Sequence, residues 1–167
     1  MRVLLPLIPL AALLLPATAP AQQARPQRLG EHEDWTAATY QEGGQKVCYA
    51  FTRPKSSEGV PDREDVMLTV THRPSQRDAV ILSAGYAYPR GAEVQVEVGG
   101  MDLDFYTAGS SAAARNGDAA IRAFKAGLEA VATGPGPGGR GRARDSFSLS
   151  GFTAAYEAIS RACPAGR

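Results

Sequence analysis

The sequence predicts a mainly β domain of antiparallel strands, with one short internal helix and a second helix near the C-terminal end. Three observations support this fold class. Apolar and polar residues alternate over several short stretches, glycine-rich turns separate these stretches, and the last apolar residues recur at helical spacing. Alternation with period two is typical of strands that bury one face, so a β-meander is expected before the C-terminal helix.

The N-terminal residues have the features of a cleavable secretory signal. Arg2 provides a positive start, residues 3–15 form an apolar run, and Ala19-Pro20-Ala21 places small residues where signal peptidase reads them. We therefore predict a signal peptide over 1–21, cleavage following Ala21, and a periplasmic or secreted protein. The run is shorter than the roughly 20 apolar residues that span a bilayer and contains two prolines, so we predict no membrane span.

Removal of residues 1–21 leaves 146 residues, in which 17 Lys and Arg balance 17 Asp and Glu. Residues 22–28 are polar and predict a flexible leader, and residues 29–167 have the length of one domain. A nucleic-acid-binding protein is expected to carry a strong positive field, which this balance does not supply. We therefore predict that nucleic acid is not a partner.

Six stretches after the leader have the alternation or apolar character of strands. They are 34–40, 45–52, 66–72, 79–88, 94–98 and 101–106. Glu42-Gly43-Gly44 separates the first two and has the glycines that a hairpin turn needs. Residues 53–64 are rich in Pro, Ser, Gly and charge, and we predict that they form a loop.

The internal helix is predicted to begin at Asn116-Gly117-Asp118 and to end near Gly127. The stretch 111–115 before it fits neither element clearly. Residues 128–133 fit a strand, although helical periodicity could extend to Val131.

The stretch 134–144 is predicted to be a mobile loop, since it is built almost entirely of Gly, Pro and Arg. A short strand is expected at 146–149, followed by the C-terminal helix with Ser150 as its N-cap. The apolar stripe of that helix ends at Cys163, which therefore points toward the core.

Two cysteines, Cys48 and Cys163, remain in the exported chain. Thiols are oxidised outside the cytoplasm, and two cysteines allow a single intramolecular pairing, so we predict a Cys48–Cys163 disulfide. The alternatives are two free thiols or a redox or metal pair. The sequence has neither a Cys-x-x-Cys pair nor a His/Cys cluster to support a redox or metal role.

The chain lacks the common catalytic motifs: Gly-x-Ser-x-Gly, His-Glu-x-x-His, and a phosphate-binding glycine loop followed by Lys-Ser/Thr. Only His32 and His72 are available for proton transfer or metal binding. We therefore predict that the protein is not an enzyme, with no catalytic residues, cofactor or metal site. The polar run 31–34 could hold a metal weakly, but neighbouring residues of an extended segment face opposite sides, which favours a solvated edge. Asp102 and Asp104 could form a carboxylate pair for acid–base chemistry, but alternation favours an exposed strand face.

Four arginines are candidates for surface contacts. Arg73 could bind an anion, or it could pair with a nearby carboxylate. We favour the ion pair. Arg140, Arg142 and Arg144 form a local basic patch that could contact an anionic surface weakly, although with Asp145 adjacent a solvated loop is favoured.

The aromatic residues leave two interpretations open. A sugar-binding platform is possible, but aromatics in alternating strands more often fill a core, which we favour. The residues concerned are Trp35, Tyr49, Phe51, Tyr86, Tyr88, Phe105 and Tyr106.

Several short patterns occur in order along the chain. They are Asp34-Trp35-Thr36, Val47-Cys48-Tyr49, Val70-Thr71-His72-Arg73-Pro74, the Gly91 turn before alternating valines, Ser148-Leu149-Ser150-Gly151-Phe152, and the terminal Cys163. Together they resemble the invasion-associated locus B family of exported bacterial proteins. The resemblance implies a β-sandwich-like domain in the periplasm or outer envelope, and it implies no catalytic mechanism.

This resemblance leads to the functional hypothesis of a non-enzymatic envelope or secreted protein that contacts an envelope or host protein, or the cell surface. The alternative is a periplasmic stabilising or chaperone-like module, in which an exposed strand edge pairs with client chains. An envelope hydrolase is the third hypothesis, and Asp102 and Asp104 are the residues that would test it.

Overall fold

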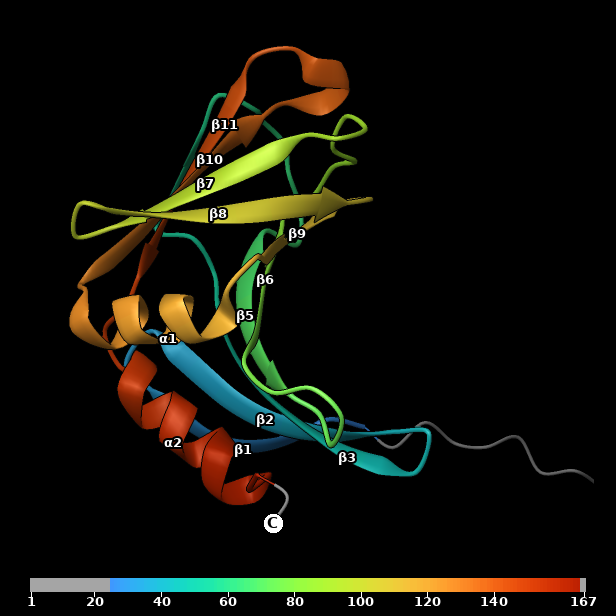
Figure 1. Cartoon of the computed structure of the whole chain (residues 1–167), viewed down its shortest axis with the longest axis vertical. Coiled ribbons are helices and arrows are strands. Elements are labelled where there is room, and N and C mark those ends of the chain that lie inside the picture. The colour runs from blue at the N-terminus through green and yellow to red at the C-terminus, as the bar shows by residue number, and fades with distance from the viewer. Residues whose placement is uncertain (1–24, 166–167) are drawn as a thin grey trace, which may run out of the picture.

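The computed structural model describes residues 25–165, and the predicted signal peptide with its cleavage site lies outside these residues. Eleven strands and two α-helices make up this part of the chain (Figure 1). The strands are β1 (Gln27–His32), β2 (Trp35–Glu42), β3 (Gln45–Thr52), β4 (Ser56–Glu58), β5 (Met67–His72), β6 (Ala79–Ser83), β7 (Glu93–Val98), β8 (Met101–Ala108), β9 (Ser111–Ala114), β10 (Glu129–Pro135) and β11 (Arg142–Ser148). The helices are α1 (Gly117–Ala126) and α2 (Phe152–Ala162). The predicted fold class, mainly antiparallel β with one internal and one C-terminal helix, is confirmed.

All eleven strands belong to one antiparallel sheet, in the order β1-β2-β3-β5-β6-β9-β8-β7-β10-β11-β4. Figure 1 shows this sheet bent into a crescent, with β1 to β3 at one end and β7, β10 and β11 at the other. The edges of the sheet are β1 and β4. The register of β1 with β2 shifts between Arg28 and Gly30, and β4 has only three residues, all of them exposed.

Both helices pack on the same face of the sheet, which is the core face. In β3 the buried Cys48 and Ala50 point toward this face, and in β7 the buried Val94, Val96 and Val98 do the same. Phe152 at the start of α2 joins the two halves of the core, because its ring contacts Trp35 of β2 edge-on, at a centroid separation of 4.9 Å, and Phe124 of α1 at 5.4 Å. Burial of such large aromatic side chains contributes much of the stability of a domain of this size.

Several predicted elements have different boundaries in the structure. Strand β1 begins at Gln27, within the stretch 22–28 that was expected to be a flexible leader, and β4 lies inside the predicted loop 53–64. Strand β6 ends at Ser83 rather than Tyr88. Gly85 follows it with a φ of +75°, and a Cβ at this position would lie 2.4 Å from the carbonyl oxygen of Glu64.

The ambiguous stretches of the sequence form regular elements. Residues 111–114 form the short strand β9, and residues 129–135 form β10, as favoured over a longer helix. Helix α1 begins as predicted, because the side chain of Asn116 accepts a hydrogen bond from the backbone N–H of Ala119 at 3.0 Å. It ends at Ala126, and its C-cap is the predicted Gly127, where a Cβ would lie 2.3 Å from the side chain of Val98.

The prediction of a mobile loop at 134–144 is wrong. Strand β10 continues to Pro135, a short 3-10 turn covers Pro137–Gly139, and β11 begins at Arg142. The glycines serve tight geometry in this hairpin. A Cβ on Gly134 would lie 2.7 Å from Val94, and one on Gly136 would lie 2.3 Å from the carbonyl oxygen of Arg140. The glycines of this hairpin are therefore needed because neighbouring atoms lie very close to the backbone, and they do not indicate a mobile loop.

The prediction of Ser150 as the N-cap of the last helix is also wrong, because Gly151 occupies that position. Gly151 has a φ of +85°, and a Cβ there would lie 1.9 Å from the carbonyl oxygen of His32. The start of α2 thus lies directly against the turn between β1 and β2. Only glycine fits this contact. The residue at the N-cap is therefore determined by close packing and not by a side-chain hydrogen bond to the helix.

Candidate functional site

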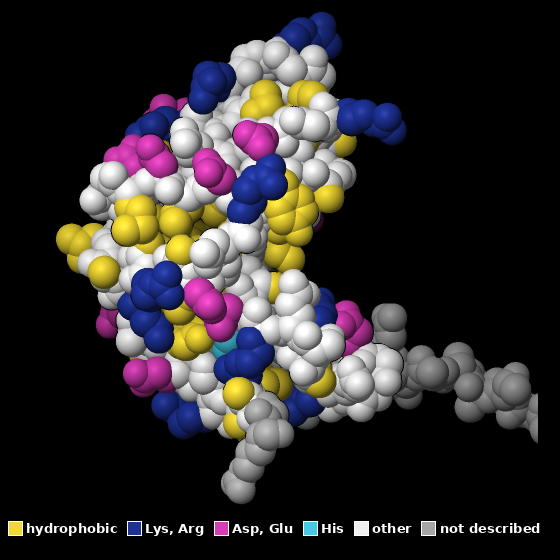
Figure 2. Space-filling view, in the orientation of Figure 1, with side chains coloured by type: hydrophobic (Ala, Val, Ile, Leu, Met, Phe, Trp, Pro, Cys, Tyr) yellow, Lys and Arg dark blue, Asp and Glu magenta, His cyan; other side chains and the backbone are white. Residues whose placement is uncertain are grey.

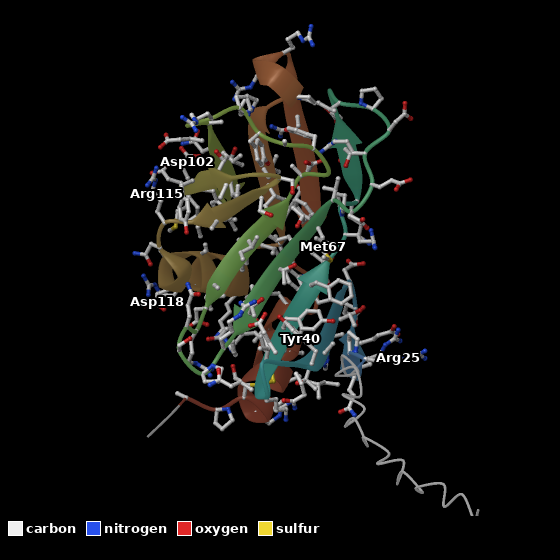
Figure 3. The ribbon with its side chains drawn as sticks, turned by 90° about the vertical axis from the view of Figure 1, so that its right-hand side faces the viewer. Arg25, Tyr40, Met67, Asp102, Arg115 and Asp118 are labelled. Carbon is white, nitrogen blue, oxygen red and sulfur yellow. A yellow bond between two sulfur atoms is a disulfide. The ribbon has the colours of Figure 1, made fainter. Side chains whose placement is uncertain are left out.

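The face of the sheet opposite the helices is hollowed where the sheet bends (Figure 2). Backbone pairing aligns one row of side chains across five strands of this face. The row is Phe51, Thr69, Ile81, Ala113 and Tyr106. Tyr40, Tyr49 and Met67 lie beside the row, and Figure 3 shows Tyr40 and Met67 on this side of the molecule. We call these eight residues the hollowed face.

The hollowed face is poor in charge and contains stacked aromatic rings. The rings of Tyr49 and Phe51 lie 5.8 Å apart at an interplanar angle of 23°, and Tyr40 meets Tyr49 edge-on at 5.7 Å. All of its side chains are half-buried except Tyr106, which is 47% exposed. The surface therefore offers apolar, aromatic and hydroxyl groups that neither helix covers.

Ion pairs border the hollowed face. Arg73 donates to Glu42 at 2.8 Å near Tyr40, and Arg115 donates to Glu93 at 2.6 Å. Glu93 pairs with Tyr106 across β7 and β8, and the guanidinium of Arg115 lies 5.8 Å from the Tyr106 ring centroid. A charge-poor centre surrounded by charged residues is the usual composition of a protein-binding surface.

The predicted aromatic core is confirmed only in part. Trp35 and Phe105 are buried, and the indole N–H of Trp35 donates to the carbonyl of Ser148 at 3.0 Å. Tyr49, Phe51 and Tyr106, by contrast, belong to the hollowed face. Tyr86 and Tyr88 form a third, half-buried group, with ring centroids 5.2 Å apart. The alternation of a strand separates aromatics by face, whereas composition alone does not.

The predicted disulfide between Cys48 and Cys163 is confirmed. Cys48 is fully buried in β3, and Cys163 is half-buried at the end of α2, with the two Cα atoms 6.0 Å apart. The bond joins the last helix to β3, the third strand of the sheet. Its role in the structure is therefore to hold α2 on the core face.

The four candidate arginines do not come together. Arg73 follows β5 and forms the expected ion pair, with Glu42, and its guanidinium also donates to the Tyr40 hydroxyl at 3.3 Å. Arg142 and Arg144 are exposed on β11, in the other half of the sheet, and Arg140 lies in the preceding turn. The prediction of a solvated loop for these three arginines, with Asp145 beside it, is wrong in part: Arg142 and Arg144 are exposed but belong to a strand, and Asp145 lies in the same strand and is 3% exposed.

The acidic candidates stay at the surface. Asp102 and Asp104 are both exposed on β8 and alternate with the buried Leu103 and Phe105, as the exposed-face interpretation predicts (Figure 3 labels Asp102).

The polar run 31–34 spans the end of β1 and the following turn. Glu31 pairs with Arg28, and Asp34 pairs with Lys55. The hydrogen bond from Lys55 lowers the pKa of Asp34 below its ordinary value. Within residues 25–165 no group of three His, Cys, Asp or Glu side chains is arranged to hold a metal ion.

One buried polar network was not predicted from the sequence. His72 of β5 is fully buried, and its Nε2 lies 3.1 Å from the hydroxyl of Ser160 in α2. The backbone N–H of Asp78 donates to Nδ1 at 3.3 Å, so the ring proton resides on Nε2 and is donated to Ser160. Tyr156 donates to the Asp78 carboxylate at 2.8 Å.

This network contains the residue types of a serine hydrolase but not their roles. A catalytic histidine accepts the serine proton, whereas His72 donates to Ser160, and the Asp78 carboxylate lies 3.7 Å from Nδ1. The arrangement ties α2 to β5 and does not activate Ser160 as a nucleophile.

The buried His72 should make stability depend on pH. Burial, with a further contribution from the positive charge of Arg77, lowers the pKa of His72 below 6.5. Between the folded pKa and 6.5 the unfolded chain binds a proton that the folded protein does not, so stability falls as the pH falls through this window. The slope is at most about 1.4 kcal/mol per pH unit.

Urea unfolding at pH 7 and pH 5 measures this effect. We expect His72→Gln, which keeps an N–H donor but does not titrate, to lose less stability between the two pH values than the wild type. Equal losses in the wild type and His72→Gln would contradict the assignment.

A buried ion pair was also missed at the sequence level. Arg63, which follows β4, makes a bidentate contact with Asp145 of β11, with N–O distances of 2.9 and 2.5 Å. The side chains are 3% and 4% exposed. Arg63 also donates to the carbonyls of Val60 and Ala84, and Tyr86 lies against its guanidinium. The pair therefore attaches the long connection before β5 to the far end of the sheet.

These features define a class of protein: a disulfide-closed antiparallel β domain with two helices on one face, of the kind found outside the cytoplasm. The family model described as Invasion associated locus B (IalB) protein matches residues 35–160, and the chain belongs to this family. The match begins at β2 and ends within α2, so it covers the core and the hollowed face. Neither a curated protein nor a solved structure matches the chain.

No helix in residues 25–165 has the length and apolar character that crossing a membrane requires.

Proposed function

We propose that this protein is exported, with cleavage following Ala21, and acts without catalysis by binding another protein of the envelope or of a host cell. The observation that supports this proposal is the hollowed face. It offers aromatic, aliphatic and hydroxyl side chains on a rigid sheet, with the ion pairs Arg73–Glu42 and Arg115–Glu93 at its border. Tyr and Met enrichment and few central charges are typical of surfaces that bind proteins.

The position of the surface also supports binding. The disulfide and the His72 network hold α2 on the opposite side of the sheet, so the hollowed face is presented by a scaffold that is fixed from behind. A preformed surface loses little conformational entropy on association. A partner is therefore expected to bind without rearrangement of the sheet.

Site-specific photocrosslinking tests the proposal directly. A photoreactive phenylalanine analogue at Ile81, in the centre of the hollowed face, should capture a partner in the native envelope or in contact with host cells. The matched control places the analogue at Glu157, an exposed position of α2. One dominant product from position 81 alone supports the proposal. Many unfolded clients would favour the chaperone-like alternative, and equal capture from both positions would contradict a specific surface.

A substitution pair gives a quantitative prediction for the captured partner. Tyr106→Ala removes the most exposed aromatic ring of the hollowed face, and we expect at least about a tenfold loss of affinity with unchanged stability. Leu128→Ala is the control, because Leu128 is 88% exposed and lies outside this face. Affinity is measured by calorimetry. Equal losses for the two variants would show that the hollowed face is not the contact surface.

A further inference from the structure

A pocket of about 370 Å³ lies beside the disulfide, where the start of β3, the segment after β5 and the end of α2 meet. Its volume falls at the lower end of the range of small-molecule sites, about 300–1,000 Å³. We call it the disulfide pocket. It lies at the edge of the molecule near the C-terminal end of α2, so an occupant would not need the hollowed face.

The disulfide pocket has a positive lining. Lys46, Arg73 and Arg77 contribute to its walls, and no described residue with a carboxylate does so. Arg73 is already paired with Glu42. Within residues 25–165 neither Lys46 nor Arg77 has a carboxylate oxygen within 4.0 Å. Among the described residues, two cations therefore face the pocket without an acidic partner.

Arg77 is placed to hold a negative group in the interior of the pocket. It is half-buried, and one Nη donates to the carbonyl of Cys163 at 2.5 Å, which orients the guanidinium. A guanidinium has five N–H donors, so others remain for a ligand. A positive charge that is partly removed from water attracts an anion more strongly than a fully solvated one.

Apart from Gln45, the rest of the lining is apolar. Pro74 and Pro164 form exposed walls, and Ala162 with the half-buried Cys163 forms the deeper surface. A small, highly charged ion would leave these apolar groups without contacts, whereas a neutral lipid would leave Lys46 and Arg77 without a counterion. A ligand that has one acidic group on an apolar chain satisfies both parts of the lining.

We propose that the disulfide pocket binds a free amphiphilic anion of the medium-chain fatty-acid class. The carboxylate lies between Lys46 and Arg77, and the chain lies against Ala162, Cys163 and the two prolines. The small volume and the position of the cations favour a single free molecule over the surface of a bilayer. This proposal does not depend on the function assigned to the hollowed face.

Calorimetric titration of the mature protein with decanoate, below its micelle concentration, tests the proposal. We expect binding of one molecule per chain, and at least about tenfold weaker binding of decanol, which has the same chain without the charge. Amide chemical shifts should change most at Arg77, Ala162 and Cys163. Equal affinities for decanoate and decanol, or binding only to vesicles of phosphatidylglycerol, would overturn the proposal.

Two variants locate the charge contact. Lys46→Met keeps the aliphatic stem and removes the charge of an exposed side chain, so it should fold normally and weaken decanoate binding about tenfold. Arg122→Met removes an exposed charge on α1 and should bind decanoate like the wild type. Unchanged binding by Lys46→Met would refute the assignment of the carboxylate position. Partner capture at the hollowed face should be normal whether or not a variant binds decanoate. The two proposals can therefore fail independently of each other.

Discussion

Replacement of Arg63 by methionine should destabilise the protein by about 3–5 kcal/mol, because it leaves the buried Asp145 carboxylate without its only cationic partner among residues 25–165. The bidentate contact closes the end of the core formed by β10 and β11, and Arg63 also satisfies two backbone carbonyls. Urea unfolding of the oxidised protein at pH 7 measures the loss.

Two further variants distinguish a buried pair from a general effect of removing charge. Arg53→Met removes a pair with Asp65 whose side chains are 64% and 87% exposed, and it should cost no more than about 1 kcal/mol. Combining Arg63→Met with Asp145→Leu should recover most of the loss, since no buried charge then remains. A loss from Arg63→Met as small as that from Arg53→Met would contradict this account.

Reduction of the Cys48–Cys163 disulfide should lower stability by about 4–5 kcal/mol. The bond joins residues 115 apart in the sequence, and in the chain-entropy model a loop of this length restricts the unfolded chain by that amount. Urea unfolding with and without reductant compares proteins that differ only in the bond. The double variant Cys48→Ala/Cys163→Ala should be at least as unstable as the reduced protein, because Cys48 is fully buried.

The location of the bond predicts which part of the reduced protein opens first. The disulfide, the Arg77 contact with Cys163 and the His72 hydrogen bond hold the end of α2, together with the buried side chain of Ile159. Hydrogen exchange should therefore increase first in α2, while β7 and β8 keep their protection. Equal stabilities of the oxidised and reduced forms, or uniform exchange, would show that the bond does not hold the helix.

The fold class could be predicted from the sequence because it depends on local patterns. Alternating apolar residues in β3 and β7, the turn at Gly43-Gly44 and the Asn116 cap are each visible within a few residues. The disulfide was predictable for a different reason, since export and two cysteines leave one pairing.

Features that depend on contacts between distant segments were not predictable. Arg63 and Asp145 are 82 residues apart, and Asp145 stands among arginines that suggested a solvated loop. Its alternation with Ala143 and Phe147, both buried, was the one local signal that it points inward. In the same way, the glycines at 134–141 suggested flexibility in the sequence. The structure shows that they are needed because Val94 and Arg140 lie too close for a Cβ.

The hollowed face shows the same limit. Alternation along β3 places Tyr49 and Phe51 on one strand face, but the sequence does not reveal that both helices cover the other face. The row from Phe51 to Tyr106 arises from the strand order, in which β9 lies between β6 and β8. Sequence periodicity identifies which residues share one face of a strand. Only the strand order of the sheet determines which strand faces lie side by side.

The two edges of the sheet have a consequence for the behaviour of the protein in concentrated solution. With a formal net charge of +1, the whole chain has little electrostatic repulsion to keep copies apart. An open sheet edge could then recruit a second copy and begin a fibril. The shifted register and the charged Arg28 and Glu31 of β1, and the brevity of β4, interrupt such templates. Resistance to self-assembly is thus built into the sheet margins.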